Sequence, residues 1–265
     1  MNEEYTKQTL SEVKGIFDEH GIDFWLDFGV LLGSIREKRF IPWDKDIDIA
    51  SWTMPKTKIR KLLDSFLSKG FLVRYFKNNC ININKRDCPV SIALYDHDSE
   101  KAYTCWFISF NKVGHLINCL ISIFSVYNPY KHLNNNLSIY IEKKMPVLFL
   151  IGSLIPYSCK NCIKKILQII QPKIGNNRMT IVIPYQFVKQ LKKIEFYNQE
   201  YLIPSQAEQL LNLRYGKWET PKKNYNYESE DGTIFKKDVC PLCGCLTKPY
   251  LFGGYKCSSC SFKLE

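Results

Sequence analysis

Three aspartates at alternate positions are the residues of this chain best suited to chemistry. Asp44, Asp46 and Asp48 lie in the segment PWDKDIDIA. If this segment is a strand, their carboxylates leave from one face, while Ile47 and Ile49 point into a core. Carboxylates held this close repel one another unless a cation lies between them, and oxygen ligands with open water positions suit Mg²⁺ or Mn²⁺ bound to a phosphate. The spacing therefore indicates phosphoryl transfer.

A glycine-containing stretch precedes the aspartates. Gly29, Gly33 and Ser34 interrupt a predicted strand over residues 23–28 and lead into a short helix. Backbone N–H groups at such a turn and helix start bind phosphate, and Arg36 would add a fork-shaped cation. We therefore expect Gly33, Ser34 and Arg36 to contact the phosphates of a donor. The competing interpretation is that the acidic segment is only a polar strand edge.

Two blocks of the sequence resemble one known family. LLGSIREKRFIPWDKDIDIA resembles the signature of the LicD/fukutin family of nucleotidyltransferase-fold phosphotransferases, G-x-L-L-G-x-x-R followed by I-P-W-D-x-D-x-D. A second block over residues 195–221, EFYNQEYLIPSQAEQLLNLRYGKWETP, is similar to the C-terminal element of that family. The first block matches at Gly29, Leu31, Leu32, Gly33, Arg36, Ile41, Pro42, Trp43, Asp44, Asp46 and Asp48.

The resemblance implies a fold, an activity and roles for residues. The fold would be α/β (α+β), with a nucleotidyltransferase-like mixed sheet flanked by helices. The activity would be transfer of a phosphorylated alcohol, such as phosphocholine or ribitol phosphate, from a CDP-activated donor to a glycan hydroxyl. Asp46 and Asp48 would hold Mg²⁺ or Mn²⁺, Gly33 and Ser34 would contact donor phosphates, and Asp44 would be a nearby acid whose role is open.

One position departs from the family pattern, which supplies a third carboxylate from a neighbouring strand. The best counterpart is PVSIALYDHD over residues 89–98, which places Ser91 where the acid is expected. Asp96 lies an odd number of residues away and should face the other side, and Asp87 or Asp98 would need a bulge. Another acid then substitutes, or metal binding is weakened, or the chain is an inactive homologue.

Composition and charge leave a second class of function open. The chain has 265 residues and a formal charge of +11, which favours polyanionic partners such as nucleotide donors, phosphorylated glycans, anionic lipid or nucleic acid. A nucleotidyltransferase or nucleic-acid-binding protein of the same fold is therefore the alternative. The two motif blocks favour the transferase.

The apolar segments predict a cytoplasmic protein. The N-terminal segment starts acidic, lacks a signal peptide and has helical apolar spacing up to Gly21. The longest apolar stretches are much shorter than the roughly 20 residues that span a membrane. Peripheral contact with a membrane stays open, because the lysines that border these stretches would meet anionic headgroups: Lys143, Lys144, Lys160, Lys164 and Lys165.

The C-terminal cysteines predict a structural zinc site. CPLCGC and CSSC place two C-x-x-C hooks in a short segment, with the spacing of a zinc ribbon whose ligands are Cys240, Cys243, Cys257 and Cys260. A pair of disulfides is the alternative and would require an oxidising compartment. We expect a phosphotransferase domain over residues 1–228, with a helical insert over about 113–175, and a ribbon-like tail over 236–265. The C-x-x-C of Cys159 and Cys162 is expected to be buried thiols.

The remaining pattern predicts closely spaced elements. Strands are expected over 46–51, 71–77, 79–84, 89–95 and 102–110, with a helix ending near Lys69 before the second of them. Residues 113–170 read as helical, 180–183 and 193–197 as short strands. Ser205 and Glu208 have capping-box spacing and predict a helix to about Arg214.

Overall fold

The computed structural model describes residues 2–76, 80–109, 155–170, 176–236, 247–250, 254–257, 259 and 263–264. The helices are α1 (Glu3–Glu19), α2 (Phe28–Arg36), α3 (Lys56–Ser68), α7 (Tyr157–Ile170), α8 (Tyr185–Val188), α9 (Ala207–Tyr215) and α10 (Tyr227–Glu230). The strands are β1 (Phe24–Leu26), β2 (Ile47–Trp52), β3 (Leu72–Phe76), β4 (Cys80–Lys85), β5 (Cys88–His97), β6 (Lys101–Ser109), β7 (Asn176–Pro184), β8 (Leu191–Phe196), β9 (Gln199–Pro204), β10 (Ile234–Lys236), β11 (Thr247–Tyr250), β12 (Gly254–Cys257) and β13 (Lys263–Leu264).

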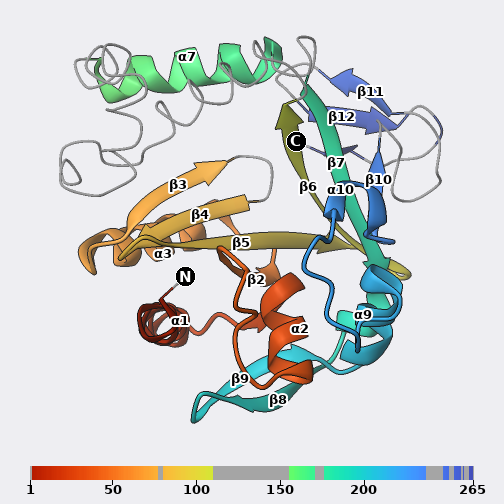
Figure 1. Cartoon of the computed structure of the whole chain (residues 1–265). Coiled ribbons are helices and arrows are strands. Elements are labelled where there is room, and N and C mark those ends of the chain that lie inside the picture. The colour runs from red at the N-terminus through yellow and green to blue at the C-terminus, as the bar shows by residue number, and fades with distance from the viewer. Residues whose placement is uncertain are drawn as a thin grey trace.

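One open mixed sheet organises the fold. Its strands follow the order β10-β7-β6-β5-β2-β1-β9-β8, and β4 pairs with β5 on one side and β3 on the other. The β2–β5 and β1–β9 pairs are parallel, and the other pairs in the sheet are antiparallel. Figure 1 shows β5 crossing the middle of this sheet, with β3 and β4 on one side and β2 on the other. The fold is thus mixed α+β.

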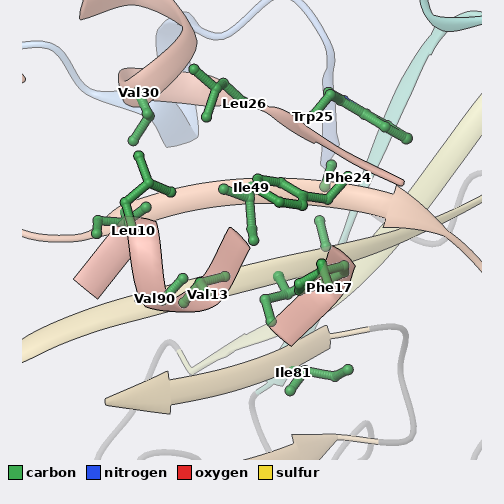
Figure 2. Packing of buried hydrophobic residues seen from close by; sticks show 14 of the residues in the cluster. Leu10, Val13, Phe17, Phe24, Trp25, Leu26, Val30, Ile49, Ile81 and Val90 are labelled. Atoms are coloured by element: carbon green, nitrogen blue, oxygen red, sulfur yellow. The ribbon is translucent and has the colours of Figure 1, made fainter. Parts of the chain in front are cut away.

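Successive side chains of β2 point alternately to the two faces of the sheet. Ile47 and Ile49 are almost fully buried and join the apolar cluster formed with α1, α3, β4 and β5. Figure 2 shows Val13 and Phe17 of α1 in the same cluster as Ile49. Burial of each such side chain contributes roughly 1.5–3 kcal/mol, so one face of β2 is fixed by the core and the other is free to carry polar residues.

Most of the predicted elements are confirmed. The N-terminal helix is α1, and Gly21 follows it with a left-handed φ of +56°. The strand predicted over 23–28 is too long, because β1 ends at Leu26 and Phe28 already belongs to α2. The capping box at Ser205 is wrong, since α9 follows Gln206 without a side-chain cap, and the Ser205 N–H donates to the Gln190 carbonyl instead.

Two predicted regions lie largely outside the described residues. The helical insert is described only through α7, which confirms a helix over part of it. Of the proposed zinc ligands, Cys240, Cys243 and Cys260 fall outside the described residues, and only the backbone of Cys257 is described, where it pairs with Thr247. In the segments that are described, no helix is long and apolar enough to cross a membrane.

Candidate active site

The three aspartates lie where the chain enters β2. Asp48 is the second residue of that strand, whereas Asp44 and Asp46 belong to the loop before it, because the strand predicted over 46–51 begins one residue later, at Ile47. The loop turns at Pro42 and Trp43, where the Asp44 N–H donates to the Ile41 carbonyl at 3.0 Å. All three aspartates are half-buried. The turn gathers them although they do not share one extended segment.

The carboxyl groups of this cluster perturb one another. Burial and the neighbouring charge of Asp46 raise the pKa of Asp44 to about 6. Burial also raises the pKa of Asp46, whose carboxyl group lies beside that of Asp44. Burial, followed by the charges of Asp46 and Asp44, raises the pKa of Asp48 well above its ordinary value. Carboxyl groups that raise one another's pKa in this way repel one another when ionised, and a cation between them would relieve this repulsion.

A glycine makes room for this arrangement. A Cβ added at Gly29, in the first turn of α2, would lie 2.0 Å from Oδ2 of Asp44. The Oδ1 atom of Asp44 accepts a hydrogen bond from the Lys45 N–H at 2.9 Å. The Asp44 carboxylate therefore lies against the start of a helix, where its negative charge is favourable.

Gly29→Ala is therefore expected to displace the Asp44 side chain while leaving the fold intact, because the clashing atom is the end of a side chain. A displacement of about 1 Å at a reacting group can lower turnover by about 100-fold. Turnover and thermal melting should be measured together. Gly15→Ala is the matched control, since nothing lies within 4 Å of a Cβ there and α1 tolerates alanine. Full activity of Gly29→Ala would contradict a role for Asp44.

The predicted phosphate turn is not where the sequence placed it. Gly33 and Ser34 lie inside α2, so the prediction of a turn at these residues is wrong. Ser34 is fully buried and its hydroxyl donates to the Leu31 carbonyl at 2.8 Å. A Cβ at Gly33 would lie 2.5 Å from the Arg39 carbonyl oxygen, so this glycine serves close packing. The contact of these two residues with a donor phosphate stays a prediction without support from their positions in α2.

Arg36 also has other partners. Its Nη1 donates to the Trp218 carbonyl at 2.8 Å, and its Nη2 donates to Glu37 at 2.6 Å. The side chain is only 9% exposed. Arg36 thus joins the two blocks that resemble the family, and its predicted contact with donor phosphate has no support in this geometry.

A buried ionic network, which was not predicted from the sequence, lies next to the aspartates. Asp27 is the N-cap of α2, and its Oδ1 accepts hydrogen bonds from the Phe28 N–H at 2.9 Å and from Nη1 of Arg214 at 2.8 Å. The Tyr95 hydroxyl donates to Oδ2 of Asp27 at 3.1 Å. The backbone N–H of Asp27 donates to the Asp48 carbonyl at 3.1 Å. Asp27 therefore links the start of α2 to the strand that carries Asp48.

Arg214, which belongs to the second block over residues 195–221, is part of this network. It lies in α9, has a side chain that is 1% exposed, and contacts Asp231 at 3.6 Å as well as Asp27. Its guanidinium stacks over the Phe28 ring at 3.6 Å. A sequence signal marks each residue separately, an aspartate just before a helix and an arginine at helical spacing from Leu210 and Leu211, but neither signal indicates that the two residues pair.

The strand beside β2 carries a neutral residue next to Asp48. Asp48 pairs with Ser91 in the parallel β2–β5 register, and Ser91 pairs with Asn82 in the antiparallel β4–β5 register. The three acids considered as substitutes lie elsewhere. Asp87 has a left-handed φ in the turn before β5, Asp96 is exposed opposite Tyr103, and Asp98 caps the turn into β6.

The donor set fits a divalent cation held by two carboxylates. Asp46 and Asp48 offer hard carboxylate oxygens of the kind that Mg²⁺ prefers, and Gly29 leaves room for Asp44 beside them. No group of three His, Cys, Asp or Glu side chains in the described ranges is arranged to hold a metal ion. Such a site would be completed by water and donor phosphate.

The C-x-x-C of α7 is not buried. Both Cys159 and Cys162 are exposed, so the expectation of buried thiols is wrong for this pair. Cys88 is buried, as expected.

Comparison with known proteins agrees with the motif analysis. Uncharacterized protein RP689 of Rickettsia prowazekii is 26% identical over 97 residues, which cover 37% of this chain and 36% of the relative. Uncharacterized protein RT0683 of Rickettsia typhi is 25% identical over 138 residues, 48% of this chain and 43% of the relative. Ribitol 5-phosphate transferase FKRP of Mus musculus is 40% identical over 43 residues, 16% of this chain and 9% of that protein. The chain spans less than half the length of each of these relatives.

A solved structure of the antibiotic-resistance factor ANT(2'')-Ia aligns with 64% of this chain and 91% of its own at 10% identity. Its TM-score of 0.32 is too low to carry an argument. The family model described as LicD/FKTN/FKRP, nucleotidyltransferase domain, matches residues 21–121, which include Asp27, the three clustered aspartates and Ser91. These residues of the chain are therefore similar to the LicD/FKTN/FKRP nucleotidyltransferase domain, as the motifs predicted.

Proposed function

We propose that this protein transfers a phosphorylated alcohol, such as a phosphocholine- or ribitol-phosphate-like group, from a CDP-activated donor to a glycan hydroxyl. The observation that carries the proposal is the half-buried cluster of Asp44, Asp46 and Asp48 inside the segment that matches the family. The relative FKRP is a ribitol 5-phosphate transferase by name, which supports this class of transferred group.

Asp46 and Asp48 would hold Mg²⁺ or Mn²⁺. A bound divalent cation offsets the charge of the donor diphosphate and of the departing CMP. The acceptor oxygen attacks the phosphorus in line, the bond between that phosphorus and the CMP oxygen breaks, and the acceptor proton must leave. We assign the proton to Asp44, the carboxyl group next to the two proposed cation ligands.

Product analysis tests this reaction. Pure protein with Mg²⁺ would be incubated with a panel of CDP-alcohols and nucleoside triphosphates, each with and without a glycan acceptor. We expect CMP release that depends on a CDP-alcohol. Pyrophosphate release from a triphosphate would instead establish the alternative, nucleotidyl transfer, which the charge of +11 favours when a nucleic acid is the acceptor. Release of neither product would identify an inactive homologue.

We also propose that the tail binds one structural Zn²⁺ through Cys240, Cys243, Cys257 and Cys260. A closed site of four thiolates has no open position, so this zinc would stabilise the tail without taking part in transfer. Elemental analysis of protein purified without added metal should find about one zinc per chain, and chelation should release it. Absence of zinc together with absence of free thiols would show disulfides.

We propose a cytoplasmic location, with peripheral contact to a membrane as a further proposal. The net charge of +11 supports attraction to anionic lipid. Sedimentation with anionic vesicles, compared with neutral vesicles, tests it.

A further inference from the structure

A row of polar side chains crosses three strands next to the aspartates. Asp48 on β2, Ser91 on β5 and Asn82 on β4 are consecutive partners in register, so their side chains leave from the same face of the sheet. All three are half-buried, whereas Ala50 and Ala93, the next pair along this face, are buried. The row is therefore an open part of the sheet that continues from the acidic cluster.

The hydrogen bond within the row determines whether the Ser91 hydroxyl offers its proton or its lone pairs to other neighbours. The Ser91 hydroxyl donates to Oδ1 of Asn82 at 3.1 Å. A serine hydroxyl has one proton and two lone pairs, so a hydroxyl that donates to Asn82 offers only lone pairs to other neighbours. Lone pairs beside the carboxylate of Asp48 are unfavourable unless a proton donor or a cation lies between them.

We propose that Ser91 Oγ is the third protein oxygen for the divalent cation at Asp46 and Asp48, and that Asn82 turns its lone pairs toward this site. The inference rests on the proposed function, because it concerns the same cation. Two carboxylates and one neutral hydroxyl hold a cation less tightly than three carboxylates. The site therefore binds the cation tightly only when the diphosphate of a donor supplies further oxygen ligands. Cation and donor then bind together.

Mn²⁺ binding, followed by electron paramagnetic resonance on the full chain, tests the inference without an assay of turnover. Titrations would be made with and without CDP as the probe. We expect Mn²⁺ affinity to rise at least tenfold when CDP is present. Ser91→Ala should weaken Mn²⁺ binding by about tenfold, Ser91→Thr should restore it, and Ser91→Asp should tighten binding without CDP by at least tenfold, since the ligand charge count sets affinity.

Asn82→Leu tests the second part of the inference. Without its acceptor, the Ser91 proton becomes free to donate to Asp48, so Mn²⁺ binding should weaken about as much as in Ser91→Ala. Ser51→Ala is the matched control, because Ser51 lies on the opposite face of β2 and donates to the Asp23 carbonyl at 2.7 Å. Melting curves of each variant confirm that the fold is retained.

The outcomes distinguish failure of the role proposed for Ser91 from failure of the proposed function. Tight Mn²⁺ binding by the wild type that none of the Ser91 variants changes would overturn the role of Ser91 and leave the proposed function standing. Absence of Mn²⁺ binding by the wild type, with and without CDP, would overturn the cation site of the proposed function itself. If Ser91→Asp fails to fold, Ser91→Ala and Ser91→Thr decide the result.

Discussion

Asp46→Asn and Asp48→Asn are each expected to lower turnover by about a thousandfold while the protein stays folded. A divalent cation supplies several kcal/mol of charge stabilisation in the transition state, and about 4 kcal/mol corresponds to that factor. The amide of asparagine keeps the shape of the side chain but loses the charge that holds the cation. Initial rates of CMP release at saturating Mg²⁺ measure the effect.

The same variants should not be less stable than the wild type when metal is absent. The pKa of Asp48 is raised by burial and by the neighbouring acids, so its ionised form is less favourable in the folded state than in the unfolded chain. Removing this charge should raise the melting temperature of the metal-free protein. Mg²⁺ should stabilise the wild type and leave Asp48→Asn unchanged.

Asp96→Asn is the matched control for both measurements. Asp96 lies near the end of β5, is exposed, and bonds only locally to the His97 N–H. It should retain turnover and the response to Mg²⁺. Wild-type turnover in both Asp46→Asn and Asp48→Asn would remove the mechanism proposed for this site.

The sequence predicted the central strands because their signals are local. In β2 and β5, apolar residues alternate with polar or small ones, and this period places Ile47 and Ile49 in the core. Ser91 was proposed from the family pattern and not from this period; the parallel register places it beside Asp48, and its role as a metal ligand stays a prediction. The zinc site and the domain boundaries stay predictions.

Other features depend on contacts that no local pattern carries. Gly33 resembled a phosphate-binding turn, but its small size is required by the Arg39 carbonyl, and the chain stays helical through it. Strand β9 was missed because the hairpin that creates it turns at Tyr197 and Asn198, both with left-handed φ, and only Asn198 signals such a turn. The pairing of Asp27 with Arg214 joins positions far apart in the chain, so it required the fold itself.

That pair leads to the second large expected effect, which is on stability. Arg214→Met should lower the free energy of unfolding by about 3–5 kcal/mol, because it leaves the carboxylate of Asp27 buried without its partner. Both side chains are 1% exposed, so water cannot solvate the Asp27 carboxylate once the Arg214 charge is removed. Chemical denaturation of the two proteins measures the difference. Arg39→Met is the matched control, since Arg39 is 52% exposed and its contact with Glu3 is 3.7 Å long.

The double variant Asp27→Asn/Arg214→Met separates the contribution of charge from that of position. Asparagine still caps α2, and removing both charges avoids the buried unpaired ion, so most of the lost stability should return. Turnover should not return fully, because Asp27 and Arg214 together join α9 to the start of α2 and, through the Asp27 N–H, to Asp48. If the double variant recovers both stability and turnover, the pair serves only to hold the fold together. If it recovers stability alone, the C-terminal block sets the geometry of a site whose acids all lie in the first fifth of the chain.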